Sequence, residues 1–372
     1  MYPLTLVTMR SKALILILFA VIQTSFVYAY PIADTTDKKL YDRARKTPAD
    51  ISADLEKLVD YLKQPASSQR EIVKAFSYWI MLNISYDISG FLQDVYNTDG
   101  INGTLRTKKG VCQDYSELFK AMCDAAGIKC YVIKGYAKAF NYRPGEAFSK
   151  ANHAWNIVWL DSQYHLMDLT WSSGYIRYET DGWHYYMQPD TSQVFVSPEA
   201  FVEKHLPSDP QWQLLTHPIP MNAFTRTDSY SAMLHDTLKY YNYADSIARF
   251  EKLDKDAQEL KEADNAYSFY PALGDYAYHY YNLAVTCSNA AIDQYNAAVT
   301  SYNKSIEDSG APVASGDYNK TVVSTALTNY QKAIKLLSRI SSYSDNQISP
   351  SALLGKCMMG LEATTELMKT LR

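Results

Sequence analysis

Apolar residues recur at helical spacing between about residues 37 and 100. Ser68 is followed three residues later by Glu71, which is the capping-box pattern of a helix start. The apolar face that follows it consists of Ile72, Val73, Phe76, Trp79, Ile80 and Ile84. An earlier face with similar spacing consists of Ile51, Leu55, Leu58, Val59 and Leu62. This part of the chain is therefore predicted to be mostly helical.

The pattern changes between Gly110 and about Thr227. Short runs of alternating, β-branched and aromatic residues occupy residues 128–140, 153–160 and 164–171, and they predict strands. From residue 228 onward the strand pattern stops, and three breaks divide the remainder into four predicted helices in two antiparallel pairs. The predicted fold class is α+β for residues 30–227, followed by an all-α C-terminal region, residues 228–372.

One predicted helix begins beside a cysteine. Its apolar face consists of Val111, Tyr115, Leu118, Phe119, Met122 and Ala126. Gly127 stands where a C-terminal glycine cap belongs, and Gly110 would let the chain turn sharply before Cys112. A thiol at a helix N-terminus ionises readily, and the free amides there can hold an oxyanion. Cys112 is therefore a candidate nucleophile.

Other roles for Cys112 stay open at this point. A single cysteine is commonly a small buried apolar residue. The odd count of five cysteines also allows disulfides, and Cys123 with Cys130 is a conceivable bridge across the helix end. No zinc-like spacing of cysteine or histidine occurs, so no metal site is predicted. A base close to the thiol would favour the nucleophile.

His153 and Asp168 flank two predicted strands of one hairpin. If residues 161 and 162 form a two-residue loop, Asp168 lies opposite Trp155 and diagonal to His153, with Cα atoms about 7–8 Å apart. A three-residue loop would turn Asp168 to the other face. Taken singly, each would be an ordinary strand histidine or turn carboxylate. Together with Cys112 they supply a nucleophile, a base and a carboxylate that orients the base.

These segments closely resemble the transglutaminase-like superfamily, part of the wider papain-like set of cysteine enzymes. The matching motifs are G-V-C-x-x-Y at Cys112, N-H-A-W-N at His153 and D-x-T-W at Asp168. The segments 83–87 (NISYD) and 205–215 (HLPSDPQWQLL) are also similar, the latter to exported bacterial members. The resemblance spans roughly residues 65 to 220.

The resemblance implies a helix bearing Cys112 packed on an antiparallel sheet that carries the general base His153 and its partner Asp168. Active members share acyl transfer through a thioester, and the family includes peptidases, amidases, protein cross-linkers and silent scaffolds. The calcium-loop pattern is absent from the sequence. Four further site candidates are two oxyanion donors and two tryptophans that either wall the cleft or pack in the core: Gln93, Gln113, Trp155 and Trp171.

Composition and the N-terminus bound the setting. Apolar residues make up 47% of the chain and the net charge is -4 with no long basic run, which excludes a nucleic-acid partner. Basic residues precede an apolar run at 13–22 and a small residue at Ala29, so residues 1–29 are predicted to be a signal peptide cleaved near Ala29. No other segment approaches membrane-spanning length. The mature chain is expected to be secreted or periplasmic.

The predicted function is an exported cysteine-dependent acyl-transfer enzyme without a cofactor, acting on peptide or amide bonds of a protein or peptide. A peptidase or amidase is favoured over a cross-linker, and the helical C-terminal region is expected to hold substrate or a protein partner. The alternative is a catalytically silent binding or scaffold module on the same fold.

Overall fold

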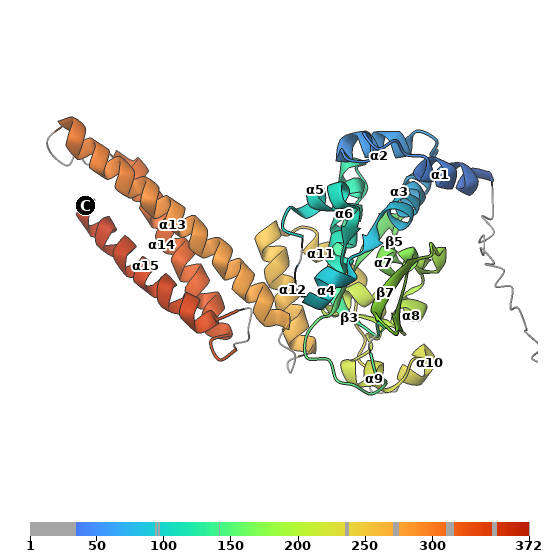
Figure 1. Ribbon diagram of the computed structural model, residues 1–372. Coiled ribbons are helices and arrows are strands. Elements are labelled where there is room, and N and C mark those ends of the chain that lie inside the picture. The colour runs from blue at the N-terminus through green and yellow to red at the C-terminus, as the bar shows by residue number, and fades with distance from the viewer. Residues whose placement is uncertain are drawn as a thin grey trace, which may run out of the picture.

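A computed structural model describes residues 35–371 except 94, 96, 141, 235–237, 271–274, 310–315 and 344–347. The predicted signal peptide, residues 1–29, lies outside the described residues. Figure 1 shows a mixed half of helices and strands, from which the last three helices project as a separate arm. None of the described helices is both long and apolar enough to span a bilayer.

In the described residues, six helices precede the main sheet, as the helical spacing before residue 100 predicts in part: α1 (Thr35–Arg45), α2 (Leu55–Lys63), α3 (Gln69–Asn83), α4 (Ile88–Gln93), α5 (Gly100–Thr107) and α6 (Cys112–Ala125). The Ser68 side chain caps α3 by accepting a hydrogen bond from the Glu71 N–H at 3.2 Å. Two short strands, β1 (Ser85–Tyr86) and β2 (Lys109–Gly110), pair in parallel just before α6. That pairing fixes where the chain enters the cysteine-bearing helix.

The main sheet is antiparallel and has the strand order β8-β5-β4-β3-β9. Its strands are β3 (Cys130–Ala137), β4 (His153–Leu160), β5 (Gln163–Met167), β8 (Val194–Val196) and β9 (His205–Pro207). A separate hairpin is formed by β6 (Gly174–Glu179) and β7 (Gly182–Met187). Three short helices lie between these strands, namely α7 (Leu169–Ser173), η1 (Thr191–Gln193) and α8 (Pro198–Phe201), and two follow the last strand, η2 (Pro210–Gln213) and α9 (Met221–Arg226). The predicted α+β class is confirmed.

Both faces of the sheet are buried, which explains why β4 is almost wholly apolar. On one face, Val158 and Met167 pack with Leu118 and Phe119 of α6, so the cysteine-bearing helix lies against β4 and β3. On the other face lies a second cluster, which includes Ile133, Trp155, Ile157, Leu166, Phe201 and Trp212. This packing holds α6 in one orientation relative to the sheet.

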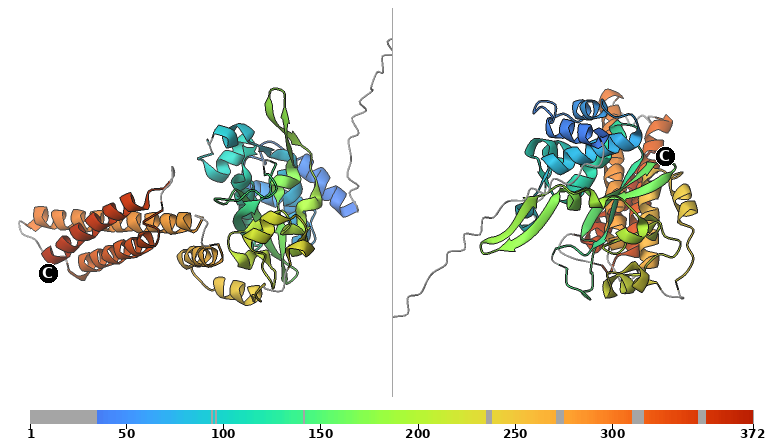
Figure 2. Two further views of the ribbon diagram at one scale, coloured as in Figure 1. Left: turned by 90° about the horizontal axis from the view of Figure 1, so that it is seen from below. Right: turned by 90° about the vertical axis from the view of Figure 1, so that its right-hand side faces the viewer.

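The C-terminal region is helical, as predicted, but its first part differs from the expectation. The described residues after 228 form six helices rather than four: α10 (Tyr230–Met233), α11 (Tyr243–Phe250), α12 (Lys255–Phe269), α13 (Asp275–Ser309), α14 (Gly316–Arg339) and α15 (Pro350–Thr370). The extra boundaries arise because the Asn242 and Asp254 side chains cap new helix starts. Figure 2 shows α13, α14 and α15 side by side, away from the sheet.

Candidate active site

Cys112 is the first residue of α6, as predicted. The Asp114 carboxylate accepts a hydrogen bond from the Val111 N–H at 2.8 Å and so tethers the residue before the cysteine. Gly110 serves a different purpose from the predicted sharp turn. A Cβ at Gly110 would lie 2.4 Å from the Asp114 Cβ, so the glycine is required by this close approach. The helix is therefore held rigidly at the end that carries the thiol.

The other end of α6 closes as the glycine cap predicts. Gly127 has a φ of 68°. Its N–H donates to the Asp124 carbonyl, and the N–H of Ile128 donates to the Cys123 carbonyl at 2.9 Å. These two bonds form a Schellman motif, which satisfies carbonyls that the end of the helix leaves free.

The β4–β5 hairpin has the predicted register. Its loop consists of Asp161 and Ser162, both with positive φ (52° and 64°), as a two-residue type I′ turn requires. Leu160 accordingly pairs with Gln163. Asp168 follows β5 directly and caps α7, where its Oδ1 accepts the Trp171 N–H at 3.1 Å. The turn geometry thus delivers Asp168 to the side of the sheet where β4 begins.

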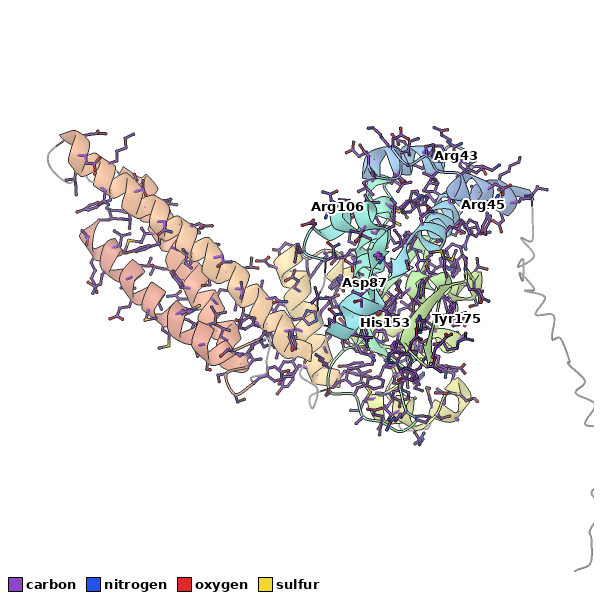
Figure 3. The ribbon with its side chains drawn as sticks, viewed as in Figure 1. Arg43, Arg45, Asp87, Arg106, His153 and Tyr175 are labelled. Atoms are coloured by element: carbon purple, nitrogen blue, oxygen red, sulfur yellow. The ribbon has the colours of Figure 1, made fainter. Side chains whose placement is uncertain are left out.

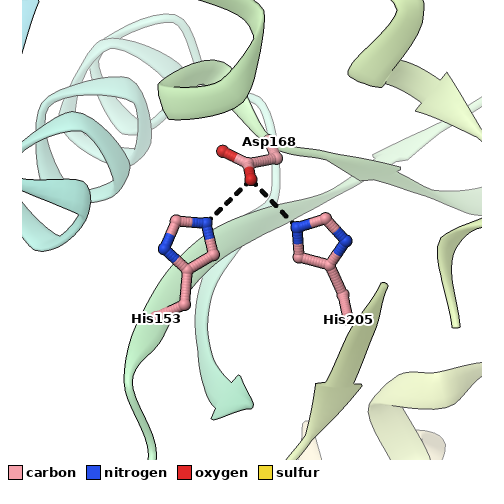
Figure 4. A group of neighbouring side chains, drawn as sticks. All are labelled: His153, Asp168 and His205. Atoms are coloured by element: carbon pink, nitrogen blue, oxygen red, sulfur yellow. Dashed lines mark hydrogen bonds and ion pairs between the residues drawn. The ribbon is translucent and has the colours of Figure 1, made fainter. Parts of the chain in front are cut away.

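The structure brings Cys112, His153 and Asp168 together. His153 Nε2 donates to Asp168 Oδ2 at 2.8 Å (Figure 4). The Cys112 thiol lines the same cavity as His153 and lies close enough to raise the pKa of that imidazole. Since Nε2 faces the carboxylate, Nδ1 is the nitrogen left for the thiol. Asp168 is fully buried and His153 nearly so, whereas Cys112 is part-exposed.

The electrostatics of this pair favour charge separation. Burial alone would lower the pKa of His153, but the ionised Asp168 beside it and the Cys112 thiol raise that pKa to about 10. Burial alone would raise the pKa of Asp168, yet the His153 charge and its hydrogen bonds hold that pKa well below its usual range. At neutral pH the pair is therefore an imidazolium–carboxylate ion pair.

A second imidazole that the sequence patterns did not single out reaches the same carboxylate. His205, the first residue of β9, has its Nε2 3.0 Å from Asp168 Oδ2 (Figure 4). It lies in a segment noted only for its family likeness, 37 residues beyond Asp168. No local spacing relates the two, because β9 reaches the site by pairing with β3.

A cavity of about 1020 Å³ opens onto Cys112 and His153. Its aromatic lining comes from β1, α4, the loop after β3, α7 and the β6–β7 hairpin: Tyr86, Phe91, Phe140, Trp171, Tyr175 and Tyr185. Figure 3 shows His153 and Tyr175 in the mixed half of the molecule. The volume and the aromatic part of the lining are typical of a ligand-binding pocket.

Of the four other predicted site residues, two line the cavity and two do not. Gln113 lines the cavity, although its amide donates to Glu117 Oε1 at 2.7 Å. Trp171 also lines the cavity, whereas Trp155 is fully buried against Phe201 in the core. Gln93 is a correction. It is exposed on α4 outside the cavity lining, and its amide donates to Ser89 at 3.1 Å.

All five cysteines are free thiols, so the disulfide alternative for Cys112 and the conceivable Cys123–Cys130 bridge do not correspond to the structure. Cys123 of α6 and Cys130 of β3 are both buried, and each packs in the core between the helix and the sheet. Two groups in the described part of the chain have ligand atoms close enough to share a metal ion: His153, Asp168 and His205, and the more exposed Glu179, Asp181 and His184. In the first group, both short contacts are the hydrogen bonds between an imidazole Nε2 and Asp168 Oδ2.

Comparison with known proteins gives a family match. Residues 56–172, which include all three triad positions, match the model of the Transglutaminase-like superfamily. The chain is 32% identical to mouse kyphoscoliosis peptidase over 55% of its own length and 30% of the relative's. It is 36% identical to the human protein of that name, with 46% and 26% covered. It is 31% identical to Lim and transglutaminase domain protein ltd-1 of Caenorhabditis elegans, with 45% and 24% covered.

The chain spans less than a third of the length of each of these animal relatives. Solved structures also match, at low scores. A TGase has a TM-score of 0.25 at 21% identity, with 38% of this chain and 35% of that chain covered. A candidate cysteine protease from Cytophaga hutchinsonii has a TM-score of 0.26 at 22% identity, with 43% and 50% covered. Such scores support no functional conclusion. The sequence match therefore identifies residues 56–172 as a transglutaminase-like segment.

Proposed function

We propose that the protein is a cysteine-dependent acyl-transfer enzyme that acts on peptide or amide bonds through a thioester, with hydrolysis favoured over cross-linking. The observation that carries the proposal is one contact chain. Cys112 at the start of α6 lies beside His153 in the cavity, and His153 donates to the buried Asp168. A nucleophile, a base and an orienting carboxylate in this sequence form the arrangement of thiol hydrolases.

The proposed reaction has two steps. The Cys112 thiolate attacks the carbonyl carbon, and the protonated His153 gives its Nδ1 proton to the departing amine, which leaves a thioester on Cys112. Neutral His153 then removes a proton from water, the hydroxyl adds to the thioester, and an acid is released with the thiol restored. The oxyanion of each step is stabilised by backbone N–H groups at the α6 N-terminus. An amine in place of water would give transamidation.

We expect the wild-type protein to generate new amino groups from unfolded protein substrates, while Cys112→Ala generates none. The assay incubates each protein with reduced, alkylated substrate proteins and a fluorescent primary amine. Mass spectrometry then reads both new termini and amine incorporation. Hydroxylamine added to a quenched reaction traps the thioester as a hydroxamate. Since alanine removes only the sulfur, the fold should be unchanged.

The products of this assay distinguish the competing functions. Cleavage without amine incorporation supports the hydrolase, and incorporation in excess of cleavage supports a cross-linker. If neither product nor hydroxamate forms with any substrate, the silent binding module replaces the enzyme. Residues 228–372 would then be the first region to test for a protein partner.

We also propose that the protein is exported, as the charged and apolar runs at its start indicate. Expression of the full chain in a secreting host should release a protein that begins at Tyr30. N-terminal sequencing checks this. A retained Met1 or Met9 on a cell-associated protein would contradict it.

A further inference from the structure

We infer that His205 is a positioning residue, which holds Asp168, and through it the His153 imidazole, in the orientation that the proposed reaction needs. The inference rests on the proposed function. It assigns a role to a buried side chain that the triad alone leaves unexplained.

The contact comes from a strand pairing distant in sequence. β9 pairs with β3 at Ala137 and His205, and β3 pairs with β4 at Gly135 and His153. The two imidazoles therefore approach the carboxylate from different strands, with ring centroids 5.6 Å apart. Both Nε2 atoms point at the same oxygen, Asp168 Oδ2, at 2.8 and 3.0 Å. Figure 4 shows the carboxylate between the two rings.

The His205 ring is clamped by aromatic side chains. Phe201 of α8 stacks on it, with centroids 4.1 Å apart and an interplanar angle of 15°. The ring of Trp171, which also lines the cavity, has its centroid 4.3 Å from that of the His205 ring. His205 is only 1% exposed. A ring held in this way has one orientation, so it can impose an orientation on the group that it contacts.

The chemistry makes His205 a donor. The titratable groups that face it are Asp168 and His153, and burial lowers the pKa of His205. A neutral imidazole carries one N–H, and an ionised carboxylate can only accept, so that proton lies on Nε2. Asp168 then receives three hydrogen bonds: two imidazole donors at Oδ2 and the Trp171 N–H at Oδ1. Three donors from three elements leave the carboxylate little freedom to rotate.

Two substitutions distinguish the hydrogen bond that His205 donates from the packing of its ring. His205→Phe keeps an aromatic ring between Phe201 and Trp171 but removes the donor. His205→Gln restores an N–H near the position of Nε2. The readout is the rate constant of Cys112 alkylation by iodoacetamide from pH 5 to 10, with sites assigned by mass spectrometry. His217→Phe, an exposed histidine of the same chain, is the matched control.

We expect His205→Phe to slow Cys112 alkylation about tenfold at pH 6, which corresponds to one hydrogen bond to a charged group. The pH range of fast alkylation should narrow, because a loosened Asp168 holds the imidazolium less firmly. His205→Gln should recover most of the rate, and His217→Phe should match the wild type. Melting temperatures, measured in parallel, show whether each variant is folded.

The inference is overturned if His205→Phe keeps the wild-type rate and profile, or if the Phe and Gln variants lose the same rate and the same stability. The latter pattern would mean a packing role alone. Failure of the proposed function looks different: the wild-type thiol would itself react only as an ordinary thiol does, near pH 8.5, and neither His205 variant would change that profile.

Discussion

Replacing His153 by alanine is expected to remove the fast alkylation of Cys112 below pH 7, with a fall in rate of about a hundredfold or more. In the proposed mechanism the imidazolium beside the thiol is the group that favours the reactive thiolate. That imidazolium is available because the pKa of His153 is raised to about 10. The wild-type rate should therefore be high at neutral pH and change as the pH rises through about 10, where His153 loses its proton. Iodoacetamide labelling with mass-spectrometric site assignment measures both limbs.

A matched variant is His184→Ala, which removes a part-exposed histidine at the β6–β7 hairpin that contacts Asp181. It should leave the profile unchanged. If wild-type Cys112 is inert below pH 7, or if His153→Ala labels as fast as the wild type there, the ion pair is absent and the enzyme proposal fails.

The second large effect is expected at the carboxylate: Asp168→Asn should lower turnover of any cleaved peptide about a thousandfold or more. Asparagine keeps the size of the side chain and can still cap α7, where Oδ1 accepts the Trp171 N–H. It lacks the charge, however, and with its oxygen at the α7 cap its NH2 group replaces Oδ2 and can accept from neither imidazole. His153 is then no longer stabilised as an imidazolium and can adopt the wrong tautomer. Turnover is read as kcat and KM separately.

Asp161→Asn provides the control. Asp161 is an exposed carboxylate in the hairpin turn, with a φ of 52° that asparagine tolerates well. Its loss should leave kcat within about twofold of the wild type, because exposed ion pairs contribute little. A wild-type kcat in Asp168→Asn would exclude the carboxylate from the proposed mechanism, and a rise in KM alone would point to a role in substrate binding.

Several features of the site follow from the sequence by itself because they depend on local interactions. The apolar face after Val111 and the glycine at 127 define α6 and hence put Cys112 at its first turn. The hairpin register follows from a two-residue loop, since one more loop residue would turn Asp168 to the opposite face. These interactions span a few residues, and the chain encodes them in its spacing. The number of helices after residue 228 is higher than the four predicted, because side-chain caps at Asn242 and Asp254 begin new helices within one expected helix.

Only the tertiary structure decided which side chains complete the site. Trp155 and Trp171 are equivalent in the sequence pattern, yet one is buried in the core and the other lines the cavity. Gln113 likewise lines the cavity, whereas Gln93 does not, because it lies on a face of α4 that points away from the cavity. His205 reaches Asp168 through a β3–β9 pairing that spans about 70 residues. Periodicity records which face of an element is apolar, but it does not record which distant element covers that face. The positions of Cys112, His153 and Asp168 could therefore be predicted from the sequence, whereas the position of His205 could not.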